Sequence, residues 1–204
     1  MECVGPETKR EKRRAAMLAA ANALFLEKGY EATTLSDIVG RSGGSLATLY
    51  DLFENKPGLL RALVGERCLA ISETVDRAVS TQQPHREALR EIAEHMFGKI
   101  LDPGAIGLFR VVIAQSAGHP DLGRQLYAAG PARGQAKVAE YFAAQAQAGT
   151  LKVDDPVAAA QMFFQMMFGH FHNQLMFGLP VVLTGQEKAR HLDRTLGAFL
   201  KIYE

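Results

Sequence analysis

Cysteine, long apolar runs and charge of one dominant sign are all scarce in this sequence, and each shortage excludes a class of protein. The two cysteines, Cys3 and Cys68, form no CxxC pair, which argues against a disulfide framework or a zinc module and favours free thiols in a reducing compartment. No uninterrupted apolar run reaches the roughly 18 residues of a membrane span, and the first five residues begin no signal peptide. We therefore expect a cytoplasmic protein with no membrane partner.

The sequence also lacks a large net charge and the common catalytic motifs. With a net charge of +1, the 204-residue chain does not announce a polyanion partner, so any contact with nucleic acid has to come from local placement of basic residues. The sequence contains no GxSxG elbow, no HExxH pair, no P-loop and no GxGxxG opening a helix after a strand. We expect no enzyme, no cofactor and no metal.

The hydrophobic pattern that is present has the period of a helix. No stretch alternates with period two over the length of a strand, and Gly or Pro breaks separate runs with apolar residues at i, i+3 and i+4. The fold class is therefore all-α, with nine or ten helices. The later part of the chain is expected to form helices over residues 56–79, 85–101, 105–116, 121–129, 132–148, 156–177 and 185–203.

A short helix is expected after two threonines near the amino terminus. Thr33 or Thr34 can accept the hydrogen bond of an N-cap. Leu35, Ile38 and Val39 then fall at i, i+3 and i+4, which is a single buried stripe on a helix of two turns.

A glycine turn and a second short helix follow at once. Gly43 and Gly44 end the first helix, and Ser45 can cap the next. Leu49 and Phe53 are its inward positions. The other positions form a mixed set with no apolar face to bury: Leu46, Ala47, Thr48 and Tyr50. Helix, tight turn and short helix make the helix-turn-helix pattern, which also occurs in α-proteins that bind no nucleic acid.

The wider run from about Arg14 to Leu63 resembles the amino-terminal domain of the TetR family of transcriptional repressors. The residues that carry the resemblance are Ala21, Phe25, Gly29, Tyr30, Thr33, Thr34, Ile38, Gly43, Ser45, Thr48, Leu49, Tyr50, Phe53, Lys56, Leu59 and Leu60. Gly44 and Gly40 depart from the pattern, and each is expected to loosen the turn by roughly 0.5–1 kcal/mol if it is helical. The resemblance implies an N-terminal arm and three-helix helix-turn-helix DNA-binding domain over 1–55, and a helical effector-binding and dimerisation domain over 56–204.

Roles in DNA binding follow from the same resemblance. A ligand-responsive homodimeric repressor would place one recognition helix per subunit in the major groove of near-palindromic double-stranded operator DNA. The residues assigned to DNA are Arg14, Thr33, Thr34, Arg41, Ser45, Leu46, Ala47, Thr48, Tyr50 and Lys56. Because neither 46 nor 47 is Arg, Asn or Gln, bidentate base readout is poor there, and we expect Arg41, the basic run before the first helix and DNA shape to supply much of the specificity.

That basic run has five positive charges in six positions, at residues 9–14. Alone it is typical of a solvated, frayed tail. Immediately before a helix-turn-helix, the resemblance implies an extension that contacts phosphates or the adjacent minor groove.

The later part of the chain resembles the AefR-like C-terminal branch of the family. The stretches that carry this resemblance are FRVVIA from Phe109, PDL from Pro120, VDDP from Val153 and GLP from Gly178. It implies a homodimer through the last two helices and a small hydrophobic effector among the C-terminal helices. The residues assigned to the effector are His95, Phe109, Arg110, Gln115, Phe163, Met166, Met167 and His170.

Plain structural roles remain open for all of these residues. The Met- and Phe-rich helix is apolar nearly all round, which a buried core explains as well as a ligand lining does. His170 and His172 cannot form a helical zinc pair, because two residues turn a helix by about 200°. The alternative function is a helical small-molecule carrier or enzyme whose amino-terminal hairpin is only structural.

Overall fold

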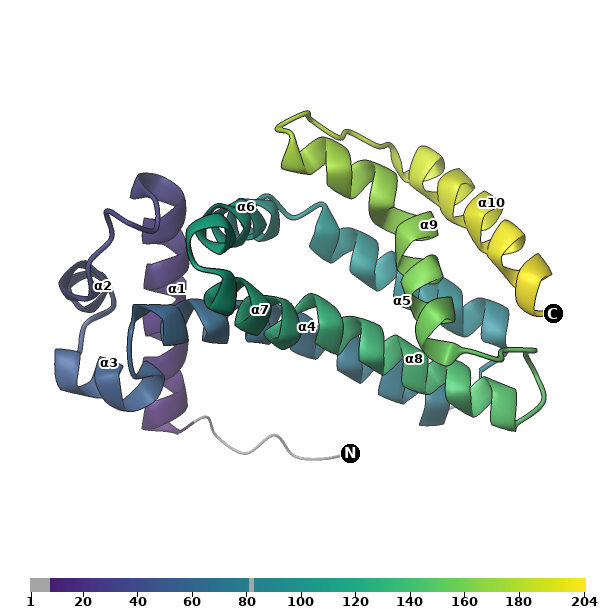
Figure 1. The fold of residues 1–204 in the computed structure, drawn as a ribbon, viewed down its shortest axis with the longest axis horizontal. Helices are drawn as coiled ribbons and strands as arrows, with labels where there is room; N and C mark the ends of the chain where they lie inside the picture. Colours follow the sequence, from purple (N-terminus) through teal and green to yellow (C-terminus); the bar gives the residue numbers. More distant parts are fainter. Residues whose placement is uncertain (1–7, 81–82) are drawn as a thin grey trace. The chain divides into compact units, whose positions relative to one another are not determined.

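The protein is all-α over the part of the chain that the computed structural model describes, residues 8–80 and 83–204 (Figure 1). The helices are α1 (Lys9–Lys28), α2 (Leu35–Ser42), α3 (Leu46–Phe53), α4 (Lys56–Ser80), α5 (His85–Ile100), α6 (Pro103–Gly118), α7 (Pro120–Ala129), α8 (Pro131–Gln147), α9 (Pro156–Met176) and α10 (Gly185–Tyr203). The predicted fold class is thereby confirmed. Cys3 and the side chain of Cys68 lie outside the described residues, so the prediction of free thiols stays a prediction.

Contacts divide the chain into two compact units. The first comprises Met1–Gly65 and Gly107–Ala129, and the second comprises Glu66–Ile106 and Gly130–Glu204. Helices α4 and α6 therefore each contribute to both units. The expected boundary at residue 56 was drawn between a DNA-binding and an effector-binding function, whereas these two units are defined by contacts. That boundary therefore stays a prediction.

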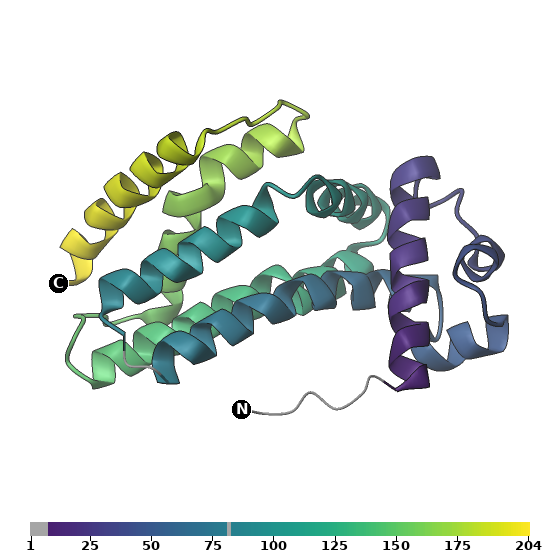
Figure 2. The ribbon, with the colours of Figure 1, turned by 180° about the vertical axis from the view of Figure 1, so that it is seen from behind.

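The core of the first unit joins α1 to the two short helices. Leu18, Ala21 and Phe25 fall at i, i+3 and i+7 on one face of α1, and all three are buried, as is Ile38 of α2. The same cluster takes in residues of α6 and α7, among them Leu108 and Leu126, so these helices belong to the scaffold that holds α1–α3. Figure 2 shows α1 from behind, with α2 and α3 beside it.

The second unit is built around α9, which packs against α8, α10 and α5. Its centre is aromatic: the rings of Phe163, Phe142 and Phe199 contact one another, and the centroid of Phe163 lies 6.1 Å from that of Phe142 and 5.4 Å from that of Phe199. The apolar stripe of α10 faces this core. Its buried members are Leu192, Leu196, Phe199 and Leu200.

Side-chain caps explain why several helices begin where they do. Thr8 and Thr184 form capping boxes with Glu11 and Glu187, and the Asp155 carboxylate accepts from two backbone N–H groups of α9. Among the described residues, no helix combines the length and the apolar character needed to cross a bilayer.

Candidate nucleic-acid interface

The helix-turn-helix of the sequence analysis is present and closely capped. Thr34 is the N-cap of α2: its hydroxyl accepts from the Asp37 N–H at 3.1 Å, and the Asp37 carboxylate accepts from the Thr34 N–H at 2.8 Å. Ser45 caps α3 by accepting from the Thr48 N–H at 3.2 Å. These local bonds satisfy N–H groups that a helix start otherwise leaves unpaired. They fix where each short helix begins.

Helix α3 presents one face to solvent and anchors the other. Leu49 and Phe53 are 0% and 4% exposed and belong to the core of the first unit, as predicted. On the opposite side, Leu46 is 40% and Tyr50 is 52% exposed, and Ala47 is exposed as well. A short helix with apolar and aromatic side chains left in water offers a surface for another molecule.

The turn between the two helices needs its glycines. Gly43 and Gly44 have φ of +73° and +104°, a region that L side chains rarely adopt. A methyl group on Gly44 would lie 3.1 Å from Met17 Cε and 3.2 Å from Arg13 Cδ. The expectation that Gly44 loosens the turn depended on a helical conformation, and that condition is not met: Gly44 stands outside both helices, at a φ that favours glycine.

Alanine at Gly40 and at Gly44 should have opposite effects on stability. Gly40 lies inside α2, its φ is not positive, and a new methyl group there would meet no other atom within 4 Å. Gly40→Ala should therefore stabilise the protein by about 0.5–1 kcal/mol. Gly44→Ala should destabilise it by about 1–2 kcal/mol through backbone strain. Urea unfolding followed by circular dichroism tests both, and each variant is the matched control of the other. Equal midpoints for the two variants would contradict the turn geometry.

Thr33 does not fit its predicted role. It is 1% exposed, and its hydroxyl donates to the carbonyl oxygens of Gly29 at 2.7 Å and Leu24 at 3.3 Å. A buried, bonded hydroxyl cannot hold a phosphate in this conformation. Thr33 instead ties the end of α1 to the start of α2, and among the two threonines only Thr34 is exposed.

Lys56 is held in place by the loop after α1. Its Nζ donates to the Glu31 carbonyl oxygen at 3.1 Å and lies 4.4 Å from the centroid of the Tyr30 ring. Partial burial lowers the pKa of Lys56, with the Glu31 charge opposing that effect. The ammonium is thus positioned at the first turn of α4 by contacts that do not neutralise its charge.

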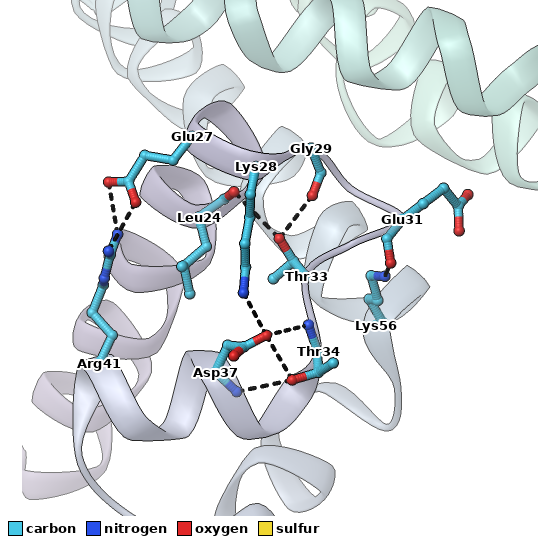
Figure 3. A network of polar contacts seen from close by, with 10 residues as sticks. All are labelled: Leu24, Glu27, Lys28, Gly29, Glu31, Thr33, Thr34, Asp37, Arg41 and Lys56. Carbon is cyan, nitrogen blue, oxygen red and sulfur yellow. Dashed lines mark hydrogen bonds and ion pairs between the residues drawn. The ribbon is translucent and has the colours of Figure 1, made fainter.

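Two ion pairs connect α1 to α2 (Figure 3). Lys28 Nζ lies 2.7 Å from Asp37 Oδ2, and Arg41 donates through both Nη atoms to the two carboxylate oxygens of Glu27, each at 2.8 Å. Hydrogen bonds from Lys28 and Thr34 hold the pKa of Asp37 well below its ordinary value. The stability that Asp37 contributes is therefore present above that ordinary pKa and is lost as the pH falls.

The basic run is part of α1 rather than an extension before it. The helix begins at Lys9, and three of its arginines contact the helix-turn-helix. Arg10 pairs with Asp51 at 3.2 Å, Arg13 donates to the Ser42 carbonyl oxygen at 3.4 Å, and the Arg14 guanidinium lies 5.8 Å from the centroid of the Phe53 ring. The expectation of a separate arm is corrected over residues 8–14: these charges are placed by a helix beside α2 and α3.

The residues assigned to an effector divide between the two units. Phe109, Arg110 and Gln115 lie on α6 within the first unit. In the second unit, Phe163 and Met167 are fully buried in the core, Met166 packs partly buried against it, and His170 is exposed beside the Phe171 ring. The remaining one, His95, lies on α5 of the second unit.

Among the described residues of the second unit, three buried polar atoms have no hydrogen-bond partner: Gln83 Oε1, His95 Nε2 and Tyr141 Oη. His95 lies on α5 and Tyr141 on α8. Burial is the main cause that lowers the pKa of His95, and burial raises the pKa of Tyr141 to about 12. Sequence reasoning missed Tyr141, because nothing in the pattern of α8 distinguishes an unpaired tyrosine from one that is bonded. Unpaired buried polar groups are uncommon and suit a ligand contact.

Family comparisons match both parts of the chain. Residues 17–63 match the family described as bacterial regulatory proteins, tetR family. Residues 87–204 match the family described as the C-terminal domain of AefR-like transcriptional repressors. The first match spans the helix-turn-helix, and the second spans most of the second unit.

Individual proteins are similar over nearly the whole chain. The HTH-type transcriptional regulator YvkB of Bacillus subtilis is 27% identical, over 91% of this chain and 94% of its own. A crystal structure of a TetR-family transcriptional regulator from Mesorhizobium loti is 27% identical with a TM-score of 0.83, covering 97% of this chain and 99% of that one. The structure of the flavonoid-responsive regulator FrrA is 28% identical with a TM-score of 0.73, covering 94% and 97%.

Proposed function

Because the chain belongs to the TetR family of bacterial transcriptional regulators, we propose that it is a cytoplasmic, homodimeric repressor that a small apolar effector releases from its operator. The observation that carries the proposal is the face of α3, where Leu46, Ala47 and Tyr50 are exposed while Leu49 and Phe53 hold the helix to the core. A recognition helix needs this combination, since it must be rigid on one side and available to base edges on the other.

The side chains around α3 supply contacts to the DNA backbone. Lys56 and the arginines at the start of α1 provide positive charge, and the hydroxyls of Thr34, Ser45 and Thr48 lie at helix starts whose N–H groups favour phosphate. Leu46 and Ala47 carry no hydrogen-bonding group, so they suit apolar contact with thymine methyl groups. Specificity then depends more on Arg41, on the basic residues at the start of α1 and on DNA shape.

Two subunits are required to read a near-palindromic operator, whose half-sites lie about 34–36 Å apart. The support for a dimer through α9 and α10 is apolar surface that the core of the second unit leaves in water. Met162 of α9 is 40% and Ile202 of α10 is 56% exposed. In the connection between these helices, Phe177, Leu179 and Val182 are 86%, 55% and 87% exposed. Association of two copies would remove this surface from water.

The effector would act by shifting the population of dimer conformations. An apolar molecule bound among the C-terminal helices would favour a dimer whose recognition helices are wrongly spaced, so that operator affinity falls. Linkage then requires that operator DNA weaken effector binding by the same factor. The Met and Phe side chains of α9 suit an apolar ligand, and the unpaired atoms of His95 and Tyr141 offer it a polar partner.

A salt titration of DNA binding tests the proposal. The purified protein is used to enrich a duplex from a randomised pool, and fluorescence anisotropy then compares that selected duplex with a random duplex of equal length. We expect the selected duplex to bind about 10³-fold more tightly or better, with log affinity falling by about 5 or more per tenfold rise in salt if six phosphates are neutralised. Equal affinity for both duplexes would contradict an operator-binding function and favour a small-molecule carrier.

A further inference from the structure

The exposed ion pair between Glu27 of α1 and Arg41 of α2 is not needed to stabilise the fold. Both side chains are largely exposed, 55% for Glu27 and 42% for Arg41. Exposed ion pairs usually contribute little to folding, and the buried side chain of Ile38 already holds α2 in the core that contains α1. The pair therefore calls for another explanation.

The geometry of the pair matches the chemistry of DNA recognition. A guanidinium fork forms the same two parallel hydrogen bonds to a carboxylate, to a phosphate or to the O6 and N7 atoms of guanine. In the free protein Glu27 already occupies both ends of that fork. Arg41 stands in the last turn of α2, four residues before Ser45, the N-cap of α3. It is thus close in the chain to the recognition-helix end that meets base edges.

We propose that Glu27 is a specificity-determining residue, which holds Arg41 away from DNA phosphates and releases it only to a bidentate partner on a base edge. This inference rests on the proposed DNA-binding function. On random DNA a phosphate has to compete with the Glu27 carboxylate for the Arg41 guanidinium, and that carboxylate repels the phosphate. On the operator, a guanine edge replaces both hydrogen bonds without that repulsion, because guanine carries no charge. Glu27 thereby weakens non-specific binding more than specific binding.

The Glu27→Gln variant tests this proposal with the two duplexes defined above. Without the carboxylate, Arg41 should engage phosphates on any sequence. We expect affinity for random DNA to rise about 3- to 10-fold, and its salt dependence to steepen by about two in log–log slope, one phosphate per subunit. Affinity for the selected duplex should rise less, so that the specificity ratio falls by about threefold or more.

Two further variants make the result decisive. Glu31→Gln removes the same charge from the loop after α1, where the side chain points away from Arg41 (Figure 3), and should leave the specificity ratio unchanged. Adding Glu27→Gln to Arg41→Ala should raise affinity for random DNA less than Glu27→Gln does alone, because without Arg41 only the repulsion by the carboxylate is relieved. Thermal melting checks that all variants fold.

Three outcomes are distinguishable. The proposed role of Glu27 is overturned if Glu27→Gln and Glu31→Gln have the same effect on affinity for random DNA and for the selected duplex. It is also overturned if Glu27→Gln raises affinity for random DNA just as much in the Arg41→Ala background. Neither result contradicts the proposed DNA-binding function. If Glu27→Gln weakens operator binding, Glu27 orients Arg41 in the complex, which also overturns the proposal. If the wild-type protein prefers no duplex, the proposed function itself fails.

Discussion

Replacing Tyr50 by alanine and Lys56 by methionine together is expected to lower affinity for the selected duplex by about 100-fold or more. Tyr50 is 52% exposed on α3, and Lys56 carries a positioned ammonium at the start of α4. Each contact to base or phosphate is worth about 1–3 kcal/mol, and a dimer loses each of them twice. Methionine retains an unbranched apolar stem and removes only the ammonium that lies over the Tyr30 ring, so the local fold should survive.

The measurement is anisotropy against salt, with melting as the check of folding. Because one cation per subunit is lost, the log–log salt dependence should become shallower by about two. The matched control replaces Tyr127, 54% exposed on α7, by alanine and Lys99, exposed on α5, by methionine, which makes the same chemical change outside the helix-turn-helix. A similar loss of affinity in the control would show a general electrostatic effect. No loss in the Tyr50 and Lys56 variant would remove α3 as the recognition helix.

Local signals in the sequence are enough to predict most helices of the second unit. The Thr184 cap and the Pro156 start place α10 and α9 to within one residue of their predicted bounds, because caps and Pro positions act on the backbone of their own turn. The capping box of Thr8 and Glu11 was readable in the same way, and it could have placed the basic run inside α1. That run instead resembled a solvated tail, since charge alone is a poor guide to helix starts.

The family could be predicted from the sequence because the residues that carry the resemblance lie close together in the chain. Gly43, Ser45, Leu49 and Phe53 define a turn, a cap and an inward face within eleven residues, and the match to the TetR family over 17–63 confirms the assignment. The AefR-like assignment is confirmed over 87–204. Both rest on short-range patterns that one sequence displays directly.

Contacts between segments on different helices could not be predicted from the sequence. Glu27 and Arg41 are fourteen residues apart on different helices, and only the packing of α1 on α2 brings them together. Thr33 looked like a second cap, yet the end of α1 closes over it. The division of the effector residues between two units depends on where α6 packs, which the period of α6 does not encode.

Truncating Phe163 to alanine is expected to cost the second unit about 3–5 kcal/mol of stability. The side chain is 0% exposed, and its ring contacts those of Phe142, Phe199 and Phe168. Removing a buried aromatic ring loses its transfer free energy and leaves a cavity that its neighbours fill only in part. Urea unfolding followed by circular dichroism should show a lower midpoint with little change in slope if the native state stays compact.

The neighbouring residue separates a core role from a ligand-lining role. Phe164 is only partly buried and touches the Phe163 and Phe168 rings from the edge of the cluster, so Phe164→Ala should cost about 1–2 kcal/mol for the same chemical change. Phe163 was predicted both as core and as effector lining, and the two roles differ in what the variant loses. A core residue loses stability in the free protein, whereas the wall of an open pocket loses ligand affinity at nearly unchanged stability. Equal stability losses at 163 and 164 would contradict the placement of Phe163 at the centre of the core, and would return it to the candidate lining of the effector site.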